Sequence, residues 1–227
     1  MKTRLAIESD GFAVLPDVFG ARECAGLLAE ISESPLSRSK AGVRHAMRHP
    51  VVAALANSAM MLSIAQQVLG PGALPFQATL FDKSSEANWL VVWHQDTALP
   101  LVERRDTPGW GPWSLKKGII YAHAPATALS QVLALRVHLD DSSPDNGPLR
   151  VLPGTHNKGV LSDDAMARFI AEIEPTTCVV ARGGVLAMRP LLVHASSKSR
   201  SGEPRRVLHI EYAASLTMDS QLELAIA

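Results

Sequence analysis

Two histidines and one aspartate, His94, Asp96 and His194, have the residue types and spacing of a metal site. Two imidazoles and one carboxylate are the ligand set that holds Fe(II) on one face and leaves coordination positions open. The preceding residues 90–93 are aliphatic or aromatic, which favours a strand. Side chains alternate along a strand, so we expect His94 and Asp96 to point to one side and Gln95 to the other. A His-x-Asp tripeptide also arises by chance, so the prediction depends on His194.

Arg205 follows His194 by eleven residues, at the beginning of a second apolar segment. Its planar guanidinium can bind a carboxylate through two parallel hydrogen bonds and keeps its charge. A dicarboxylate whose other end chelates the metal needs such a partner. Arg206 lies on the opposite face of the same expected strand and could replace Arg205 only if the register shifted by one residue.

These residues resemble the iron site of the phytanoyl-CoA dioxygenase family. The segment 146–156, Asn-Gly-Pro-Leu-Arg-Val-Leu-Pro-Gly-Thr-His, is similar to the Asn-Gly-x-Leu-x-x-x-Pro-Gly-Ser/Thr-His segment of that family and lies between the ligands in the same order. The resemblance extends from about Asp10 to Tyr212. The chain departs from the family at Gly183-Gly184, where the family often has Gly-Asp.

The resemblance implies a double-stranded β-helix that binds Fe(II) and uses 2-oxoglutarate and O2 as co-substrates. Such an enzyme hydroxylates or otherwise oxidises an unactivated C–H bond and releases succinate and CO2. His94, Asp96 and His194 would be the metal ligands and the catalytic centre, and Arg205 with Ser196 would bind the distal carboxylate of 2-oxoglutarate. Related halogenases lack the carboxylate ligand, so Asp96 favours hydroxylation or another oxidation such as desaturation.

Further polar residues are candidates for the same site. Gln77 precedes His94 by seventeen residues, as in ectoine hydroxylase-like members of the family, where the amide contacts the co-substrate; alternatively it faces solvent. Arg136 and His138 share one face of an expected strand. They would contact substrate or co-substrate if that face is the barrel interior, and would be surface charges otherwise. The histidines without a partner at a suitable spacing are assigned no role: His45, His49, His123 and His209.

The apolar patterns predict a mainly β fold with flanking helices, of the jelly-roll or cupin-like type. Many short apolar segments are separated by Gly, Pro and Asn, as in an all-β sandwich or barrel. Strands are expected at residues 11–16, 75–81, 89–96, 131–139, 149–152, 178–181, 185–193 and 206–213, and helices at 21–31, 50–69 and 163–173.

The whole chain, 1–227, is expected to form a single domain in which 98–130 is an active-site lid insertion. Residues 98–118 have no strong period, and a long loop of this kind is usually functional. We interpret its tryptophans as apolar walls of the substrate site and its arginines as partners of an anionic group. Alternatively, the tryptophans anchor the loop to the barrel exterior and the arginines are solvated. The four residues are Arg104, Arg105, Trp110 and Trp113.

Composition indicates a soluble, cytoplasmic protein, either a monomer or a homodimer. Lys+Arg and Asp+Glu balance at 22 each, so neither nucleic acid nor a membrane is an expected partner. The acidic residues near the N-terminus argue against a signal peptide, and no apolar run approaches ~18 residues. Cys24 and Cys178 do not form a disulfide framework.

Two other classes of function stay open at this point. One is a non-catalytic cupin-like barrel that only binds a ligand, and iron affinity would argue against it. The other is a cupin metalloenzyme that does not use 2-oxoglutarate, for which Arg205 would be superfluous. The sequence has no concentrated basic stripe for the phosphates of a CoA ester. The Arg104-Arg105 and Lys116-Lys117 pairs leave a CoA ester open as an alternative, but the expected substrate is a small-molecule metabolite or natural-product intermediate.

Overall fold

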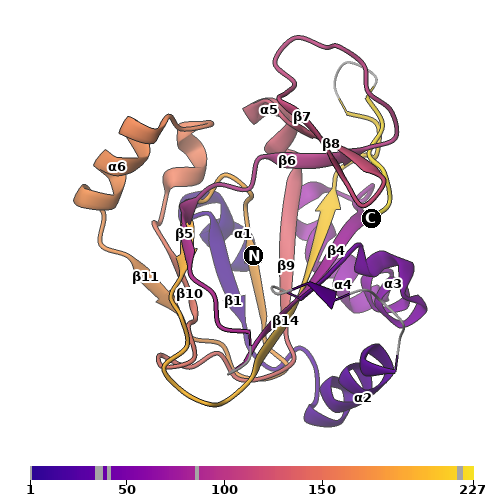
Figure 1. Ribbon diagram of the computed structural model, residues 1–227, viewed down its shortest axis with the longest axis vertical. Coiled ribbons are helices and arrows are strands. Elements are labelled where there is room, and N and C mark those ends of the chain that lie inside the picture. The colour runs from indigo at the N-terminus through magenta and orange to yellow at the C-terminus, as the bar shows by residue number, and fades with distance from the viewer. Residues whose placement is uncertain (1, 34–37, 40–41, 85–86, 219–221) are drawn as a thin grey trace.

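The computed structural model describes residues 2–33, 38–39, 42–84, 87–218 and 222–227 (Figure 1). Its main sheet has seven strands, each antiparallel to its neighbours. In spatial order these are β1 (Phe12–Leu15), β12 (Val185–Met188), β9 (Val132–His138), β14 (Arg205–Ala213), β4 (Leu74–Lys83), β3 (Gly42–Arg44) and β2 (Arg38–Ser39).

Two smaller sheets complete the β structure. The four-stranded sheet has the order β11 (Thr176–Cys178), β10 (Leu149–Val151), β13 (His194–Ser196) and β5 (Val91–His94). The three-stranded sheet has the order β6 (Ala98–Leu101), β8 (Ile119–His123) and β7 (Trp113–Lys116). Residues of the main and the four-stranded sheets line one common cavity, so these two sheets face each other.

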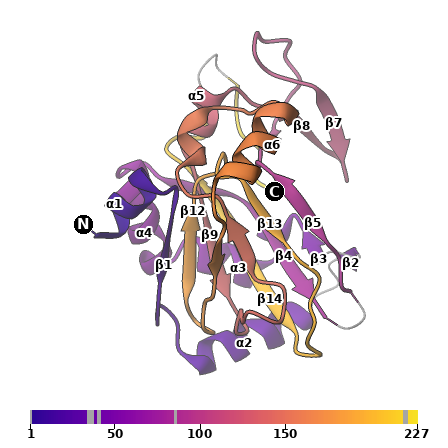
Figure 2. The same ribbon diagram turned by 90° about the vertical axis from the view of Figure 1, so that its left-hand side faces the viewer.

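Helices cover the outer face of the main sheet. Figure 1 shows α2 (Ala21–Ser32), α3 (Pro50–Ala56) and α4 (Ala59–Leu69) on one side of it, and α1 (Lys2–Ser9) packs into the same hydrophobic cluster. In Figure 2, α6 (Asp163–Glu172) lies in front of the strands, on the far side from these helices. The remaining short helices are η1 (Ala46–Arg48), α5 (Ala126–Leu129) and η2 (Thr155–Lys158).

The alternation of side chains along β14 separates the core from the cavity. Leu208, Ile210 and Tyr212 pack into the cluster under the helices. Arg205, His209 and Glu211 therefore point to the opposite face, which looks toward the four-stranded sheet. Polar residues in a buried strand are placed in this way without interrupting the apolar core.

The predicted mainly β architecture is confirmed, but several boundaries were wrong. The expected helix 50–69 is two helices, because the chain breaks at Asn57 and Ser58 caps α4 by accepting a hydrogen bond from the Met61 amide at 3.4 Å. The expected strand 185–193 ends at Met188, and the chain turns at Arg189, where the Leu192 amide donates to its carbonyl at 3.1 Å. Helix α1 and strands β2 and β3 were not predicted.

The segment 98–118 is not the continuous irregular loop that we expected. It contributes β6 and β7, which both pair with β8. The turn at Lys117-Gly118, with both residues at positive φ, joins β7 to β8. Strands this short, with Pro100 inside one and an exposed Leu115 in another, lack a clear apolar alternation, so their pattern was missed.

Cys24 and Cys178 are both buried and free. Among the described residues no single helix is long and apolar enough to cross a membrane, although α3 and α4, bent by 49° at their junction, meet the length and composition criteria as a pair.

Candidate functional site

The three predicted metal ligands meet at one end of the cavity. The ligand atoms of His94, Asp96 and His194 all lie within 4.8 Å of one another. Nε2 of His94 is 3.6 Å from Oδ1 of Asp96, and Nε2 of His194 is 3.5 Å from Oδ2. His94 on β5 and His194 on β13 are directly paired across the four-stranded sheet. The sheet register therefore brings together residues a hundred positions apart.

Asp96 reaches this site by another route than the predicted one. Strand β5 ends at His94, so alternation along one strand does not orient the aspartate. Instead, the Asp96 amide donates a hydrogen bond of 2.9 Å to the carbonyl of Pro190, in the turn that leads to His194. Gln95 does point away, and its amide donates to the carbonyls of Gly159 and Leu191.

Both histidines have a fixed tautomer. Nδ1 of His94 donates to the Val92 carbonyl at 2.8 Å, and Nδ1 of His194 donates to the Leu192 carbonyl at 2.8 Å. Each Nε2 is thereby left as the atom with a free lone pair. Burial lowers the pKa of His194 to about 4, so its ring is neutral at physiological pH.

Asp96 supplies the negative charge. Burial opposes its ionisation, but His194 and His94 outweigh burial and hold its pKa below its usual range. Burial lowers the pKa of His94, but the hydrogen bond and charge of Asp96 outweigh it, so that its pKa is raised. Two imidazoles that present Nε2, together with one carboxylate, suit a divalent cation.

A smaller cavity of about 100 Å³ extends from the triad to Arg205. Arg205 is 3% exposed, and its Nε donates to the Asn146 carbonyl at 3.3 Å. Ser196 Oγ donates to the Gly147 carbonyl at 2.8 Å and lies 3.5 Å from Nη2 of Arg205. The arginine and the serine expected to act together are therefore neighbours at the end of the cavity that faces the triad.

Lys83, which was not predicted, lies next to this end of the site. It is 1% exposed, and its ammonium donates to Ser196 Oγ at 2.9 Å and to the Ser197 carbonyl at 2.6 Å. Lys83 on β4 is paired with Arg205 on β14. Burial and then the charge of Arg205 lower the pKa of Lys83 to about 8, so it stays largely protonated at neutral pH.

The choice of Arg205 over Arg206 is consistent with the structure. Arg206 binds Asp140 through two hydrogen bonds, Nε to Oδ2 at 2.6 Å and Nη2 to Oδ1 at 2.8 Å. Arg206 is not among the residues that line the cavities at the triad, whereas Arg205 is.

Arg136 and His138 point into the barrel interior, which answers the question that the sequence left open. On β9 they are paired with His209 and Val207 of β14, on the cavity side. Nη1 of Arg136 lies 3.0 Å from Nδ1 of His209, while its buried Nε has no hydrogen-bond partner in the described part of the chain. Both ring nitrogens of His138 likewise lack a partner there, and burial, then Arg136 and Arg205, lower its pKa to about 3.

The donor set fits Fe(II) and 2-oxoglutarate. The smaller cavity is lined by the three predicted metal ligands and by Arg205 and Ser196, and the ammonium of Lys83 donates to Ser196. Neither Arg205 nor Lys83 carries a carboxylate partner within the described residues. Burial, reinforced by Arg136, lowers the pKa of Arg205 only to about 10, so it remains charged. Arg205 and Lys83 are two buried cations without a compensating carboxylate, and the buried Nε of Arg136 has no hydrogen-bond partner. Both observations favour a bound anion.

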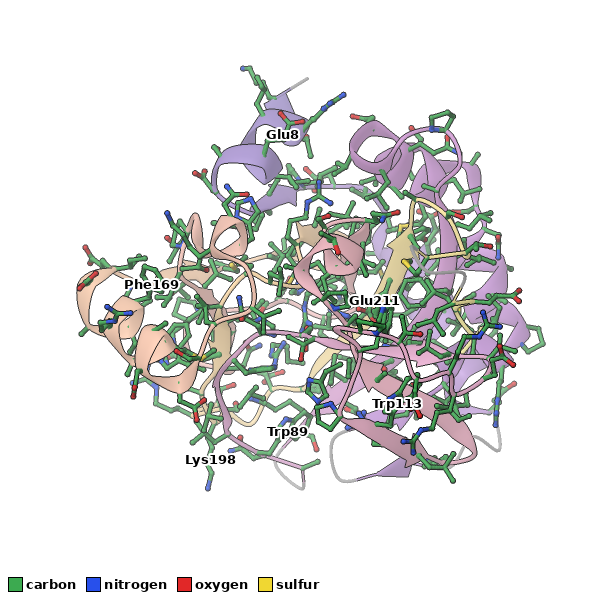
Figure 3. All side chains as sticks on the ribbon, turned by 90° about the horizontal axis from the view of Figure 1, so that it is seen from above. Glu8, Trp89, Trp113, Phe169, Lys198 and Glu211 are labelled. Carbon is green, nitrogen blue, oxygen red and sulfur yellow. The ribbon has the colours of Figure 1, made fainter. Side chains whose placement is uncertain are left out.

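A larger cavity of about 330 Å³ opens on the other side of His94 and Asp96. Gln77 lines this cavity and not the smaller one, so the structure places it apart from Arg205. Its amide nitrogen donates to Glu211, and its amide oxygen accepts a hydrogen bond of 2.9 Å from Tyr121. Glu211 is buried, near the middle of the molecule in Figure 3. Sequence reasoning missed both Glu211 and Tyr121.

The expected lid residues do not line either cavity at the triad. Trp110 is buried in a hydrophobic cluster with Phe76, Leu99 and Leu222. Trp113 is half-buried, with the Arg104 guanidinium 5.6 Å from its ring, and Arg105 forms an exposed ion pair with Glu103. The segment does contribute to the larger cavity, through other side chains: Ala98, Lys116, Tyr121 and His123.

Comparisons with known proteins agree with this geometry. L-proline trans-4-hydroxylase of Streptomyces griseoviridis is 22% identical over 188 residues, which cover 71% of this chain and 62% of that enzyme. Ectoine dioxygenase of Sphingopyxis alaskensis is 26% identical over 167 residues, 66% of this chain and 48% of that enzyme. The chain thus spans between about half and two-thirds of the length of these relatives.

A solved structure supports the fold. EctD from S. alaskensis with 2-oxoglutarate and 5-hydroxyectoine has a TM-score of 0.70 at 21% identity, over 95% of this chain and 76% of that chain. The predicted double-stranded β-helix is confirmed by this similarity. The profile of the phytanoyl-CoA dioxygenase family matches residues 7–207, nearly the whole chain. On this evidence of sequence and fold, the chain belongs to the phytanoyl-CoA dioxygenase family.

Proposed function

We propose that the protein is an Fe(II)- and 2-oxoglutarate-dependent oxygenase that hydroxylates, or otherwise oxidises, an unactivated C–H bond of a small molecule. The observation that carries this proposal is the position of the triad between two cavities. The smaller cavity reaches Arg205 and Ser196, to which Lys83 donates, as a dicarboxylate requires, and the larger one has room for a second small molecule. Family membership and the hydroxylase relatives support the same activity.

Each side chain has a role in this proposal. His94, Asp96 and His194 hold the metal, and the carbonyls of Val92 and Leu192 keep the proton of each imidazole on Nδ1. Arg205, Lys83 and Ser196 bind the distal carboxylate of 2-oxoglutarate. Fe(II), 2-oxoglutarate and O2 together supply the oxidising power, with succinate and CO2 as products. The protein contributes position, charge neutralisation and exclusion of water.

The substrate is proposed to be a small metabolite or natural-product intermediate. The larger cavity, at about 330 Å³, is at the low end of the usual range for ligand sites, ~300–1,000 Å³. A CoA ester would have to leave most of its length outside such a cavity. The relatives are named for small substrates, proline and ectoine.

The proposal is tested by anaerobic reconstitution followed by assays of succinate release. We expect one Fe(II) per chain, saturable binding of 2-oxoglutarate, and succinate release stimulated by the correct small molecule. Protein that folds but has no affinity for Fe(II) would instead be a ligand-binding barrel. Protein that binds Fe(II) but not 2-oxoglutarate would be a metalloenzyme of another class.

A further inference from the structure

The larger cavity is lined by charged groups of both signs. Arg44 comes from β3 of the main sheet and Lys116 from β7 of the three-stranded sheet, and both line the cavity. The carboxylates that line it are Asp96 and Glu211. Asp96 is a metal ligand, so Glu211 is the carboxylate left to face a substrate.

Arg44 and Lys116 have no carboxylate partner in the described part of the chain. The Lys116 ammonium lies over the ring of Tyr121, 4.6 Å from its centroid, which fixes it at the cavity wall. Burial and then the charge of Arg44 lower the pKa of Lys116, so the two cations act on each other. Two adjacent, uncompensated cations favour an anionic group between them.

Glu211 is held in place by a chain of hydrogen bonds. It is 4% exposed, and its Oε2 accepts a hydrogen bond from the amide nitrogen of Gln77. Gln77 is fixed in turn by the Tyr121 hydroxyl, which lies 3.1 Å from Nε2 of His45. A carboxylate has about four acceptor positions, and the Gln77 amide uses one of them.

A buried carboxylate whose hydrogen-bond donor is a neutral amide is costly unless a cation approaches it. His209 does not meet this need by a hydrogen bond, because its Nε2 is 3.9 Å from Oε2 of Glu211. The ammonium group of a ligand would supply Glu211 with both a positive charge and hydrogen-bond donors.

We infer that the larger cavity binds a small amino acid, with its carboxylate between Arg44 and Lys116 and its amino group at Glu211. The inference rests on the proposed function, because the cavity is that of the substrate. It also gives the substrate a fixed orientation, since reversal would place carboxylate against carboxylate at Glu211. His94 and Asp96 line the same cavity, so a ligand bound there lies next to the proposed metal site.

The experiment measures binding without turnover, on anaerobic protein loaded with Fe(II) and 2-oxoglutarate. The probes are the twenty proteinogenic L-amino acids, screened by saturation-transfer NMR, with dissociation constants from calorimetry. Each binder is compared with its methyl ester, which lacks the carboxylate, and with its deamino analogue, which lacks the ammonium. We expect at least one binder, and at least about tenfold weaker binding of both analogues.

Variants assign the two ends of the ligand. Arg44→Gln and Lys116→Gln should weaken binding of the amino acid about tenfold or more and leave binding of its ester unchanged. Glu211→Gln should weaken the amino acid but not its deamino analogue. Arg48→Gln and Lys117→Gln are the matched controls, because these neighbours do not line the cavity. Arg44 is exposed, so its replacement should not impair folding even if that of Glu211 does.

Three outcomes would overturn the inference: no amino acid binds, the esters bind as tightly as the acids, or the Arg44 and Lys116 variants keep the affinity of the unmodified protein. Titration of 2-oxoglutarate into protein loaded with Fe(II) alone separates a failure of this inference from a failure of the proposed function. If 2-oxoglutarate binds and amino acids do not, only the substrate class is wrong; if neither binds, the proposed function fails as well.

Discussion

At the scale of single residues, the two proposed ligand histidines are oriented in the same way. Each Nδ1 donates to the carbonyl two residues earlier, from His94 to Val92 and from His194 to Leu192. The backbone of each strand thus fixes the tautomer that leaves Nε2 free to bind a cation. No other side chain is needed for this, and the motif residues themselves therefore contain most of the information for the metal site.

The first prediction concerns the metal. His94→Ala, Asp96→Ala and His194→Ala should each lower Fe(II) affinity by at least about 10–100-fold, because the remaining two ligands cannot fix the ion on one face. Anaerobic iron titration with measurement of bound metal checks this. His49→Ala serves as control, since it removes a histidine that does not line either cavity at the triad. Full iron occupancy in a ligand variant would exclude that residue from the site.

The second prediction concerns Arg205. Arg205→Ala should weaken 2-oxoglutarate binding by about 2–5 kcal/mol, because a buried carboxylate loses its charge-assisted partner. Iron affinity should change little. Arg206→Ala is the matched control and should retain 2-oxoglutarate affinity, since Arg206 is paired with Asp140. Calorimetric titration distinguishes the two arginines, and a loss confined to Arg206→Ala would reverse the assignment.

The third prediction concerns pH and Lys83. Its pKa is lowered to about 8 by burial and by Arg205, so the ammonium is present below that pH and lost above it. Binding of a dicarboxylate favours the charged form, and the affinity for 2-oxoglutarate should therefore fall as pH rises through about 8. Lys83→Met should bind 2-oxoglutarate more weakly at pH 7, with a flatter profile between pH 7 and 9. An identical pH profile in the variant would remove Lys83 from the site.

At the scale of elements, the sequence predicted the strands that carry the ligands better than the contacts between them. His94, His194 and Arg205 each lie in a short motif and could be identified directly. Lys83 and Glu211 belong to no recognisable motif, and their positions in the site depend on the register of β4 against β14. One signal in the sequence was available for Glu211. Side chains alternate along a strand, so residues 205, 207, 209 and 211 share one face, which places Glu211 on the same side as Arg205.

The segment 98–130 illustrates the other limit of sequence reasoning. Irregular composition indicated a loop over the active site, but pairing with β8 organises β6 and β7 into a sheet. Pairing between strands is a tertiary interaction that local propensity does not reveal. The expectation that the segment contributes to the substrate site survives as a proposal through Lys116, Tyr121 and His123, which line the larger cavity.

The fourth prediction tests the role of the tryptophans. Trp110 is 8% exposed within a hydrophobic cluster, so Trp110→Ala should lower the free energy of unfolding by about 3–5 kcal/mol. The ratio of succinate to oxidised product should stay unchanged in the protein that remains folded. Denaturant unfolding together with that ratio checks this. Trp113→Ala, at a half-buried position, should be the milder change; uncoupled succinate release in either variant would instead support the lid interpretation.

At the scale of the whole molecule, the C-terminal segment 222–227, for which no element was predicted, joins two of the three sheets. The Ala227 amide donates to the Phe76 carbonyl at 2.7 Å, and the Ala78 amide donates to the Ala227 carbonyl at 2.9 Å. Leu224 forms a bridge with Leu101 of β6, and Ala227 packs with Tyr121 of β8. The segment 222–227 therefore connects β4 of the main sheet with the sheet that forms one wall of the larger cavity.

The fifth prediction follows from this connection. Deletion of residues 222–227 removes these hydrogen bonds and exposes the apolar surface that Leu222 and Leu224 cover, so the melting temperature should fall. The proposed metal ligands lie on the four-stranded sheet and next to it. Among the described residues, the segment 222–227 does not pair with that sheet. Fe(II) affinity should therefore persist below the melting transition, while binding at the wall formed by Lys116 and Tyr121 weakens. Equal loss of both affinities in folded protein would mean that the two cavities are stabilised together rather than by separate sheets.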